Sequence, residues 1–166
     1  SLIQTGNFNI NLEKIDLKDL LFKLIYEFNS LAKEKDLQLN FDPGNVESFI
    51  LGDEYTLAQT FQNLIDNAIK YTEHGKVEVK IYSNGNGKIN VDVKDTGIGI
   101  SQEYMPNLFK PFSQEEDGYS RKFEGNGLGL ALTKKYIELN NADIKVNSKK
   151  GEGTTFTVIL NQFLTA

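Results

Sequence analysis

The sequence contains no cysteine, which excludes disulfide bonds, thiolate nucleophiles and cysteine-bound zinc. It has a single histidine, His74, so histidine-rich metal sites are excluded and a histidine-based catalytic triad is disfavoured. No apolar run approaches the roughly 20 residues that cross a bilayer, and no signal peptide is recognisable. We therefore expect a cytoplasmic domain. Because the chain starts at Ser1 and not at Met, we expect an excerpt from a longer protein, and membrane anchoring of that parent stays open.

Positive charge is also scarce. The chain has 18 Lys and Arg against 23 Asp and Glu, which gives a formal net charge of -5 at pH 7. Surfaces that coat nucleic acid neutralise many phosphates with Lys and Arg, so we expect no nucleic-acid partner. The length of 166 residues suits one domain and is enough to bury a core without covalent staples.

The spacing of apolar residues predicts an α+β fold. Helical spacing indicates helices over 16–35, 53–72 and 127–140, the first with Asp16 as its N-cap. Period-two alternation indicates strands near 8–12, 37–41, 48–51, 77–81, 89–95, 144–146 and 156–160, with a helical turn within 102–109. The strands form hairpins and the helices do not alternate regularly with them. This pattern predicts a two-layer α/β sandwich, a mixed sheet with three helices covering one face.

The helix expected over 53–72 has two different faces. Its apolar residues, which suit packing on a sheet, are Phe61, Leu64, Ile65 and Ala68. Asn63, Asn67 and Lys70 follow at i, i+4 and i+7 and share another face. Asparagine is a poor helix former, so two asparagines on one helix face suggest a functional role that offsets their cost in stability. An amide oxygen suits Mg²⁺ that is already bound to phosphates, and Lys70 would face a phosphate. A plain polar surface is the alternative.

Two glycine segments suggest a nucleotide site. Asp95 ends a strand and can accept a hydrogen bond from the exocyclic amine of adenine, while Gly97 and Gly99 permit positive φ and close approach to a flat ligand. Gly127 and Gly129 open the third helix, whose N-terminus favours phosphate. The alternatives are a strand-to-loop turn and a glycine-rich loop end. The P-loop, protein-kinase and Rossmann patterns are all absent, so a nucleotide would need another fold.

Five segments, in this order, are similar to the motifs of the ATP-binding catalytic domain of bacterial sensor histidine kinases. They are NLIDNAIKY (63–71, the N box), DTGIG (95–99, G1), LFKPF (108–112, F), GNGLGL (125–130, G2) and GEGTTF (151–156, the last glycine box). The resemblance spans nearly the whole chain. It implies a Bergerat-type ATP-binding fold over residues 9–162, preceded at 1–8 by the remnant of a dimerisation helix or linker.

The resemblance implies that ATP and Mg²⁺ bind, and it gives roles to individual residues. Asn67 would be the metal ligand and Asp95 would select adenine. Catalysis would rest on Asn63, Lys70 and Arg121, which position the phosphates and stabilise their charge. The implied nucleotide-binding set is Asn63, Asn67, Lys70, Tyr71, Asp95, Gly97, Gly99, Gly125, Gly127, Leu128, Gly129, Leu130 and Thr155.

Residues 113–126 are rich in charge and have no apolar periodicity, which predicts a mobile loop. The resemblance implies that this loop is a lid over ATP, hinged near Phe112 and Gly127. Phe109 and Phe112 would anchor its near end, although they are equally well read as core aromatics. Glu124 departs from the family pattern, which often has glycine there.

Type II topoisomerases, MutL repair proteins and heat-shock chaperones are hydrolytic members of the same superfamily. They resemble each other in placing a Glu, the general base for water, four residues before the metal-binding Asn. Here that position is Asn63, which takes no proton at neutral pH, and Asp66 points elsewhere on the helix. Water should therefore be a poor acceptor. The resemblance implies transfer to a histidine on a separate dimerisation domain, with a response-regulator receiver domain as a further partner.

His74 is not expected to be that acceptor, because it lacks an amphipathic helical context and reads as a surface residue. The isolated domain is expected to be a monomer. Two rival functions remain. One is an ATP-binding interaction module without catalysis. The other is an aspartic-protease-like dimer that uses the triplet of Asp95, Thr96 and Gly97, which the predicted helices argue against.

Overall fold

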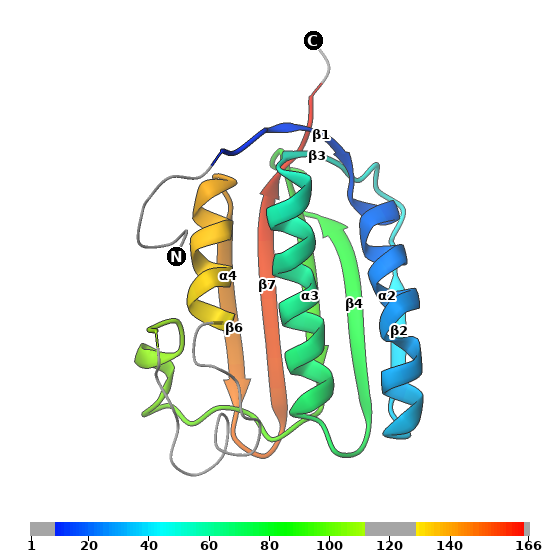
Figure 1. The fold of residues 1–166 in the computed structure, drawn as a ribbon, viewed down its shortest axis with the longest axis vertical. Helices are drawn as coiled ribbons and strands as arrows, with labels where there is room; N and C mark the ends of the chain where they lie inside the picture. Colours follow the sequence, from blue (N-terminus) through cyan, green and yellow to red (C-terminus); the bar gives the residue numbers. More distant parts are fainter. Residues whose placement is uncertain (1–8, 112–128, 165–166) are drawn as a thin grey trace.

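The computed structural model describes residues 9–111 and 129–164. The elements are β1 (Glu13–Asp16), α2 (Leu17–Glu34), β2 (Gln38–Asp42), β3 (Phe49–Gly52), α3 (Glu54–Lys70), β4 (Lys76–Ser83), β5 (Lys88–Asp95), η1 (Met105–Asn107), α4 (Gly129–Leu139), β6 (Asp143–Lys149) and β7 (Gly153–Asn161). Helices α2, α3 and α4 lie side by side over one face of the main sheet (Figure 1). The predicted α+β sandwich is confirmed.

The main sheet has the strand order β2-β4-β5-β7-β6 and is mixed. β2 pairs with β4 in parallel, and every other pairing in this sheet is antiparallel. β5 and β7 are the central neighbours, and their register sets Asp95 opposite Thr154. The last residue of β5 and the first residues of β7 therefore lie side by side at one end of the sheet.

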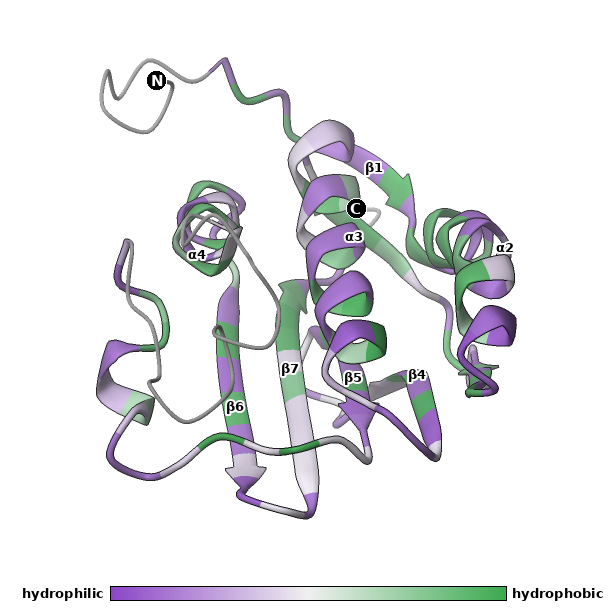
Figure 2. Cartoon of the chain, turned by 60° about the horizontal axis from the view of Figure 1, so that its bottom comes forward, coloured by the Kyte–Doolittle hydropathy of each residue, from purple (hydrophilic) through white to green (hydrophobic). Residues whose placement is uncertain are grey.

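The core lies between the sheet and the helices. α3 contributes fully buried side chains to it, namely Leu57, Phe61, Leu64, Ile65 and Ile69. Figure 2 shows green and purple alternating along β6 and around α3, which matches a buried and a polar side on α3 and partly buried residues alternating with exposed ones along most of β6. Burying one such side chain stabilises the fold by about 1.5–3 kcal/mol. Within residues 9–111 and 129–164, none of the helices combines the length and the apolar character that a bilayer crossing demands.

Aspartates begin the first two helices, as their N-cap chemistry requires. Asp16 accepts a hydrogen bond from the amide of Asp19 at 3.2 Å, which confirms the predicted cap of α2. Asp53 caps α3 by accepting from the amide of Thr56 at 3.0 Å. Burial raises the pKa of Asp53, but hydrogen bonds from Thr56 and Asn11 outweigh it, so the pKa lies below its ordinary value.

A second, small sheet joins β1 and β3 in antiparallel register. The far end of the chain adds to it, because Ile50 bridges Gln162 and the amide of Phe163 donates to the carbonyl of Phe49 at 2.9 Å. The ammonium of Lys14 lies 4.3 Å from the centre of the Phe49 ring. β3 is therefore held on both sides, by segments from opposite ends of the chain.

The strand expected near 8–12 is wrong in position. Residues 9–12 form no strand, and β1 begins at Glu13. The reason is tertiary, since the pairing partner of β1 is the four-residue β3. The amide of Asn11 is instead bound to the Asp53 carboxylate at 3.1 Å. Residues 1–8, Phe112 and the expected lid at 113–126 lie outside the described residues.

Candidate nucleotide-binding site

The polar face of α3 is present as the helical spacing predicts. Asn63 and Asn67 are half-buried on this helix and Lys70 is exposed at its last residue. The Lys70 ammonium lies 2.9 Å from the Asp66 carboxylate, one turn earlier. Both side chains are partly exposed, and such a pair contributes only about 0.3–0.5 kcal/mol. Lys70 is thus held near the helix end by an ion pair that a phosphate can replace.

The C-terminal end of α3 is fixed by contacts from distant segments. The Lys35 ammonium donates to the carbonyl of Ile69 at 2.6 Å and to that of Lys70 at 3.3 Å. The carbonyl of the buried Tyr71 accepts from the amide of Ile98 at 3.1 Å. The end of the helix therefore supports the glycine segment that follows β5.

Asp95 ends β5 and is 6% exposed. One carboxylate oxygen, Oδ1, accepts from the amides of Gly97 at 2.9 Å and Thr154 at 3.2 Å. The other oxygen, Oδ2, accepts no hydrogen bond from any residue in the described ranges. Burial raises the pKa of Asp95 to about 6, against the two amides, which lower it. A buried acceptor without a partner is costly, so Oδ2 is suited to an N–H donor from a ligand.

The glycines beside Asp95 are required by the protein's own backbone. A Cβ at Gly97 would collide with the carbonyl oxygen of Tyr71, and one at Gly99 with that of Lys149. The positive φ expected at both positions occurs only at Gly99, where φ is +72°. Gly153 has φ +117°, and its Cβ would strike the carbonyl oxygen of Asp95. Three segments thus meet too closely for any side chain.

The turn between β6 and β7 closes this edge of the site. Thr154 is buried next to Asp95, and its hydroxyl lies 2.7 Å from that of Ser148. The Ser148 hydroxyl also accepts from the amide of Ile100 at 2.8 Å. Thr155, the residue predicted from the sequence, is half-buried on the opposite face of the strand, because side chains alternate. Thr154 was not among the site residues predicted from the sequence. Its spacing of two residues from Phe156 indicates that both side chains lie on the same, buried face of the strand.

The F-box segment packs between β7 and α4. The ring of Phe109 meets that of Phe156 edge to face at 6.4 Å between centroids, and the ammonium of Lys134 lies 5.8 Å from its centre. Gly129 begins α4, and Leu130 packs against the core. The other predicted residues here, Arg121, Gly125, Gly127 and Leu128, lie outside the described residues.

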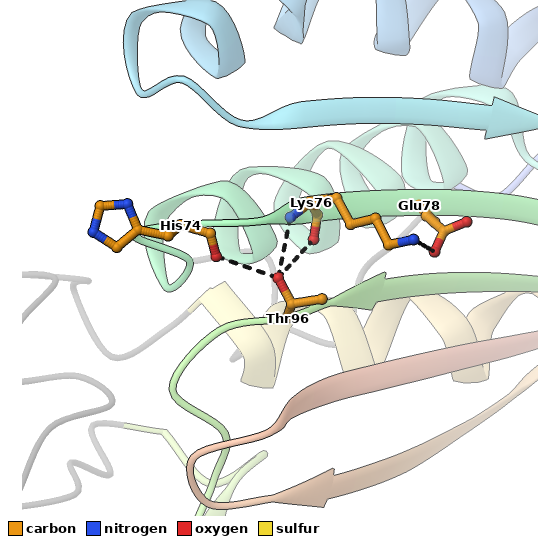
Figure 3. A network of polar contacts seen from close by, with 4 residues as sticks. All are labelled: His74, Lys76, Glu78 and Thr96. Atoms are coloured by element: carbon orange, nitrogen blue, oxygen red, sulfur yellow. Dashed lines mark hydrogen bonds and ion pairs between the residues drawn. The ribbon is translucent and has the colours of Figure 1, made fainter.

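His74 is exposed in the turn between α3 and β4, as predicted. Figure 3 shows its imidazole pointing away from Lys76, Glu78 and Thr96, while its carbonyl accepts from the Thr96 hydroxyl at 3.4 Å. The Thr96 oxygen in turn accepts from the amide of Lys76 at 3.0 Å. The hydrogen bonds that join His74 and Lys76 to Thr96 are therefore made by backbone and hydroxyl groups, not by the imidazole.

Across residues 9–111 and 129–164, no group of three or more His, Cys, Asp or Glu side chains is placed to hold a metal ion. A divalent cation near Asn67 would need oxygen ligands of another kind in addition to the amide. Phosphate oxygens are such ligands, and Mg²⁺ commonly binds through few protein groups and substrate phosphates.

Comparison with known families gives a match over residues 52–163. The matching family comprises the histidine kinase-, DNA gyrase B- and HSP90-like ATPases. The chain belongs to this family. The matched region contains α3, Asp95, the glycine segments and β7, which are the parts that build the site above. The resemblance drawn from the five sequence motifs is confirmed.

The curated relatives are sensor histidine kinases. The autoinducer 2 sensor kinase/phosphatase LuxQ of Vibrio parahaemolyticus is 35% identical over 96% of this chain and 19% of its own length. Hybrid signal transduction histidine kinase L of Dictyostelium discoideum is 34% identical over 96% of this chain and 10% of its own. Sensor histidine kinase RcsC of Escherichia coli is 33% identical over 95% and 17%. The chain thus spans about a fifth or less of these relatives.

Solved structures agree with this assignment. Full-length ShkA in complex with AMPPNP superposes with a TM-score of 0.81 and 25% identity, over 96% of this chain and 33% of ShkA. The nucleotide-free catalytic domain of histidine kinase ThkA gives 0.79 at 23% identity, over 92% of this chain and 96% of that domain, and shows the same fold. Together with the relatives, this makes the chain the ATP-binding catalytic domain of the histidine kinase branch.

Proposed function

We propose that this domain binds ATP with Mg²⁺ and donates the γ-phosphoryl group to a histidine on the dimerisation domain of its parent protein. The observation that carries the proposal is the polar face of α3. It presents two amides, Asn63 and Asn67, and its nearby carboxylate, Asp66, is paired with Lys70. The position of a general base for water is thus taken by Asn63, whose amide accepts no proton at neutral pH.

The adenine end of the site is assigned to Asp95. Its Oδ2 atom is a buried acceptor in need of a donor, and the exocyclic amine of adenine supplies one. Gly97 and Gly99 let the surrounding backbone lie close enough to form a slot. Tyr71 and Leu130 would border it. Within the G2 box, Gly129 would face the phosphates, together with Gly125, Gly127 and Leu128, which lie outside the described residues. Thr155 stays a predicted nucleotide-binding residue without an assigned role.

The phosphate end is assigned to α3. Asn67 is the proposed metal ligand, since a neutral amide oxygen suits Mg²⁺ that shares its charge with phosphates. The magnesium ion would supply charge neutralisation on the phosphate oxygens. Lys70 would leave Asp66 for a phosphate, and Arg121 would add a second positive charge. Their joint contribution is positioning and charge stabilisation of the transferred group.

The acceptor is proposed to lie outside this chain, because its one histidine, His74, is exposed in a turn and not on an amphipathic helix. In the proposed reaction an imidazole nitrogen forms a bond to the γ-phosphorus as the bond to the β–γ bridging oxygen breaks, and ADP leaves. The longer relatives support partners of this kind, a phosphoacceptor domain and a receiver domain. Residues 9–162 are proposed as the catalytic unit, and residues 1–8 as the remnant of a dimerisation helix or linker.

The test is nucleotide binding followed by transfer. We expect wild type to bind a non-hydrolysable ATP analogue in a Mg²⁺-dependent manner, and Asn67→Ala to lose that dependence. Radiolabelled ATP should then label an added dimerisation domain that carries the acceptor histidine, and a version with that histidine changed to Gln should stay unlabelled. Binding without transfer would favour the interaction module instead. Rapid ATP hydrolysis by wild type would contradict the missing-base argument.

A further inference from the structure

Thr133 on α4 contacts the polar face of α3 and has no part in the roles assigned above. Its side chain is 0% exposed. The hydroxyl donates to the carbonyl of Gly129, one turn earlier, at 2.8 Å. The same oxygen lies 3.3 Å from the amide nitrogen of Asn63 on α3.

The proton count of this cluster fixes the direction of both bonds. A hydroxyl has one proton, and the Gly129 carbonyl can only accept, so the Thr133 proton is committed to Gly129. The Thr133 oxygen must then accept, and Asn63 must donate through its NH₂ group. The orientation of the Asn63 amide therefore follows from this hydrogen-bond pattern. Its carbonyl oxygen, Oδ1, is left without a partner among the described residues.

The contact is held in place from the other end of the two helices. Asn140, just after α4, accepts from the amide of Asp53 at 2.7 Å and donates to the Thr56 hydroxyl at 2.9 Å. Asp53 and Thr56 form the N-terminal cap of α3. Because α3 and α4 are joined there through a buried amide, the position of Thr133 along α3 is set.

We propose that Thr133 is a positioning residue that orients the Asn63 amide, so that its oxygen faces the magnesium–phosphate site and a hydrogen-bond donor is required at position 63. The inference rests on the proposed function. It adds a reason why position 63 carries an amide and not the glutamate of the hydrolytic relatives. A carboxylate cannot donate a hydrogen bond. At position 63 it would compete for the Thr133 hydroxyl proton, which otherwise bonds the Gly129 carbonyl.

The first test needs no nucleotide. In Thr133→Val the side-chain shape is kept while the acceptor is lost, so the NMR resonances of the Asn63 side-chain amide should shift and those of Asn67 should not. Thr133→Ser should leave the Asn63 resonances near their wild-type position. Thr60→Val is the matched control, because Thr60 is equally buried and donates to the Thr56 carbonyl at 2.8 Å without contacting Asn63. Unmoved Asn63 resonances in Thr133→Val would overturn the proposal.

The second test measures affinity for AMPPNP with and without Mg²⁺. Thr133→Val should weaken Mg²⁺-dependent binding about three- to tenfold, as expected for one neutral hydrogen bond, while Mg²⁺-free binding stays unchanged. Thr133→Ser, which keeps the hydroxyl, should retain the Mg²⁺-dependent affinity of the wild type, and so should Thr60→Val. In an Asn63→Ala background Thr133→Val should have no further effect. Additive losses would overturn this proposal alone, whereas a wild type without Mg²⁺-dependent binding would overturn the proposed function and this inference with it.

Discussion

The two halves of the proposed nucleotide site are built in different ways. The adenine half, around Asp95, is made of backbone segments so close that Gly97, Gly99 and Gly153 admit no side chain. The phosphate half is made of partly exposed side chains on α3, with Lys70 in a surface ion pair. The first is formed before a ligand arrives, while the second can rearrange around one. Recognition of the base and handling of the phosphates are thus assigned to a rigid and an adaptable region.

The largest effect on stability is expected when a glycine of the adenine half is replaced by alanine. Gly99→Ala should lower the free energy of unfolding by about 3 kcal/mol or more, because it adds left-handed strain to a collision with the Lys149 carbonyl. Urea denaturation measures this loss. The control is Gly85→Ala, which has a similar φ of +78° but no atom within 4 Å of its Cβ, and should cost about 1–2 kcal/mol. Equal losses for both variants would contradict the close-packed interpretation.

The buried carboxylate predicts a pH dependence of stability. The pKa of Asp95 is about 6 in the folded state against an ordinary 3.8. Between these two pH values the native carboxyl group keeps a proton that the unfolded chain has released. This contribution is fully present below pH 4 and is lost as the pH rises through 6, by at most about 3 kcal/mol. Urea titrations at a series of pH values should therefore show a decline between pH 4 and 6.5 that is absent in Asp95→Asn. An identical profile in the variant would exclude Asp95 as its source.

The same carboxylate should govern the choice of base. Asp95→Asn should weaken binding of adenine nucleotides by roughly 10- to 100-fold, since a bond to a charged acceptor is lost, and calorimetry measures it. The control is Asp92→Asn on the same strand, where the carboxylate accepts from Tyr82 and Thr157 instead. A comparable loss in the control would show that general damage to β5, not recognition, is responsible.

The smallest effect is expected in the phosphate half. Asp66→Asn removes the partner of Lys70 and should change the free energy of unfolding by less than about 0.5 kcal/mol, because the pair is partly exposed. Affinity for Mg²⁺-AMPPNP should stay equal or rise slightly, since Lys70 no longer has to leave a carboxylate. Thermal melts and binding titrations measure the two quantities. A marked loss of affinity would show that Asp66 itself belongs to the site.

The sequence was sufficient where the signal is local and periodic. The two faces of α3, the cap at Asp16 and the antiparallel pairing of β4 with β5 all follow from residues close together in the chain. It failed where segments from far apart decide the outcome. β1 begins where β3 can pair with it, and Gly97 is required by the carbonyl of Tyr71 and not by its own φ.

The choice between Thr154 and Thr155 shows the same limit at a single residue. The motif brought both threonines to attention, but only the register of β7 against β5 reveals which of them stands beside Asp95. The role of Thr133 was also out of reach, because its contact with Asn63 spans 70 positions in the chain. Family motifs name the neighbourhood of a site, and the tertiary structure decides which atoms face each other.

β3 is the shared neighbour of both ends of the chain, and it passes through Gly52 directly into Asp53, the cap of α3. A pull on either flank is therefore delivered to the same short strand, two residues from the helix that carries Asn63 and Asn67. Segments near both ends of the described residues are thus anchored to the strand that leads into α3, the helix proposed to bind the phosphates.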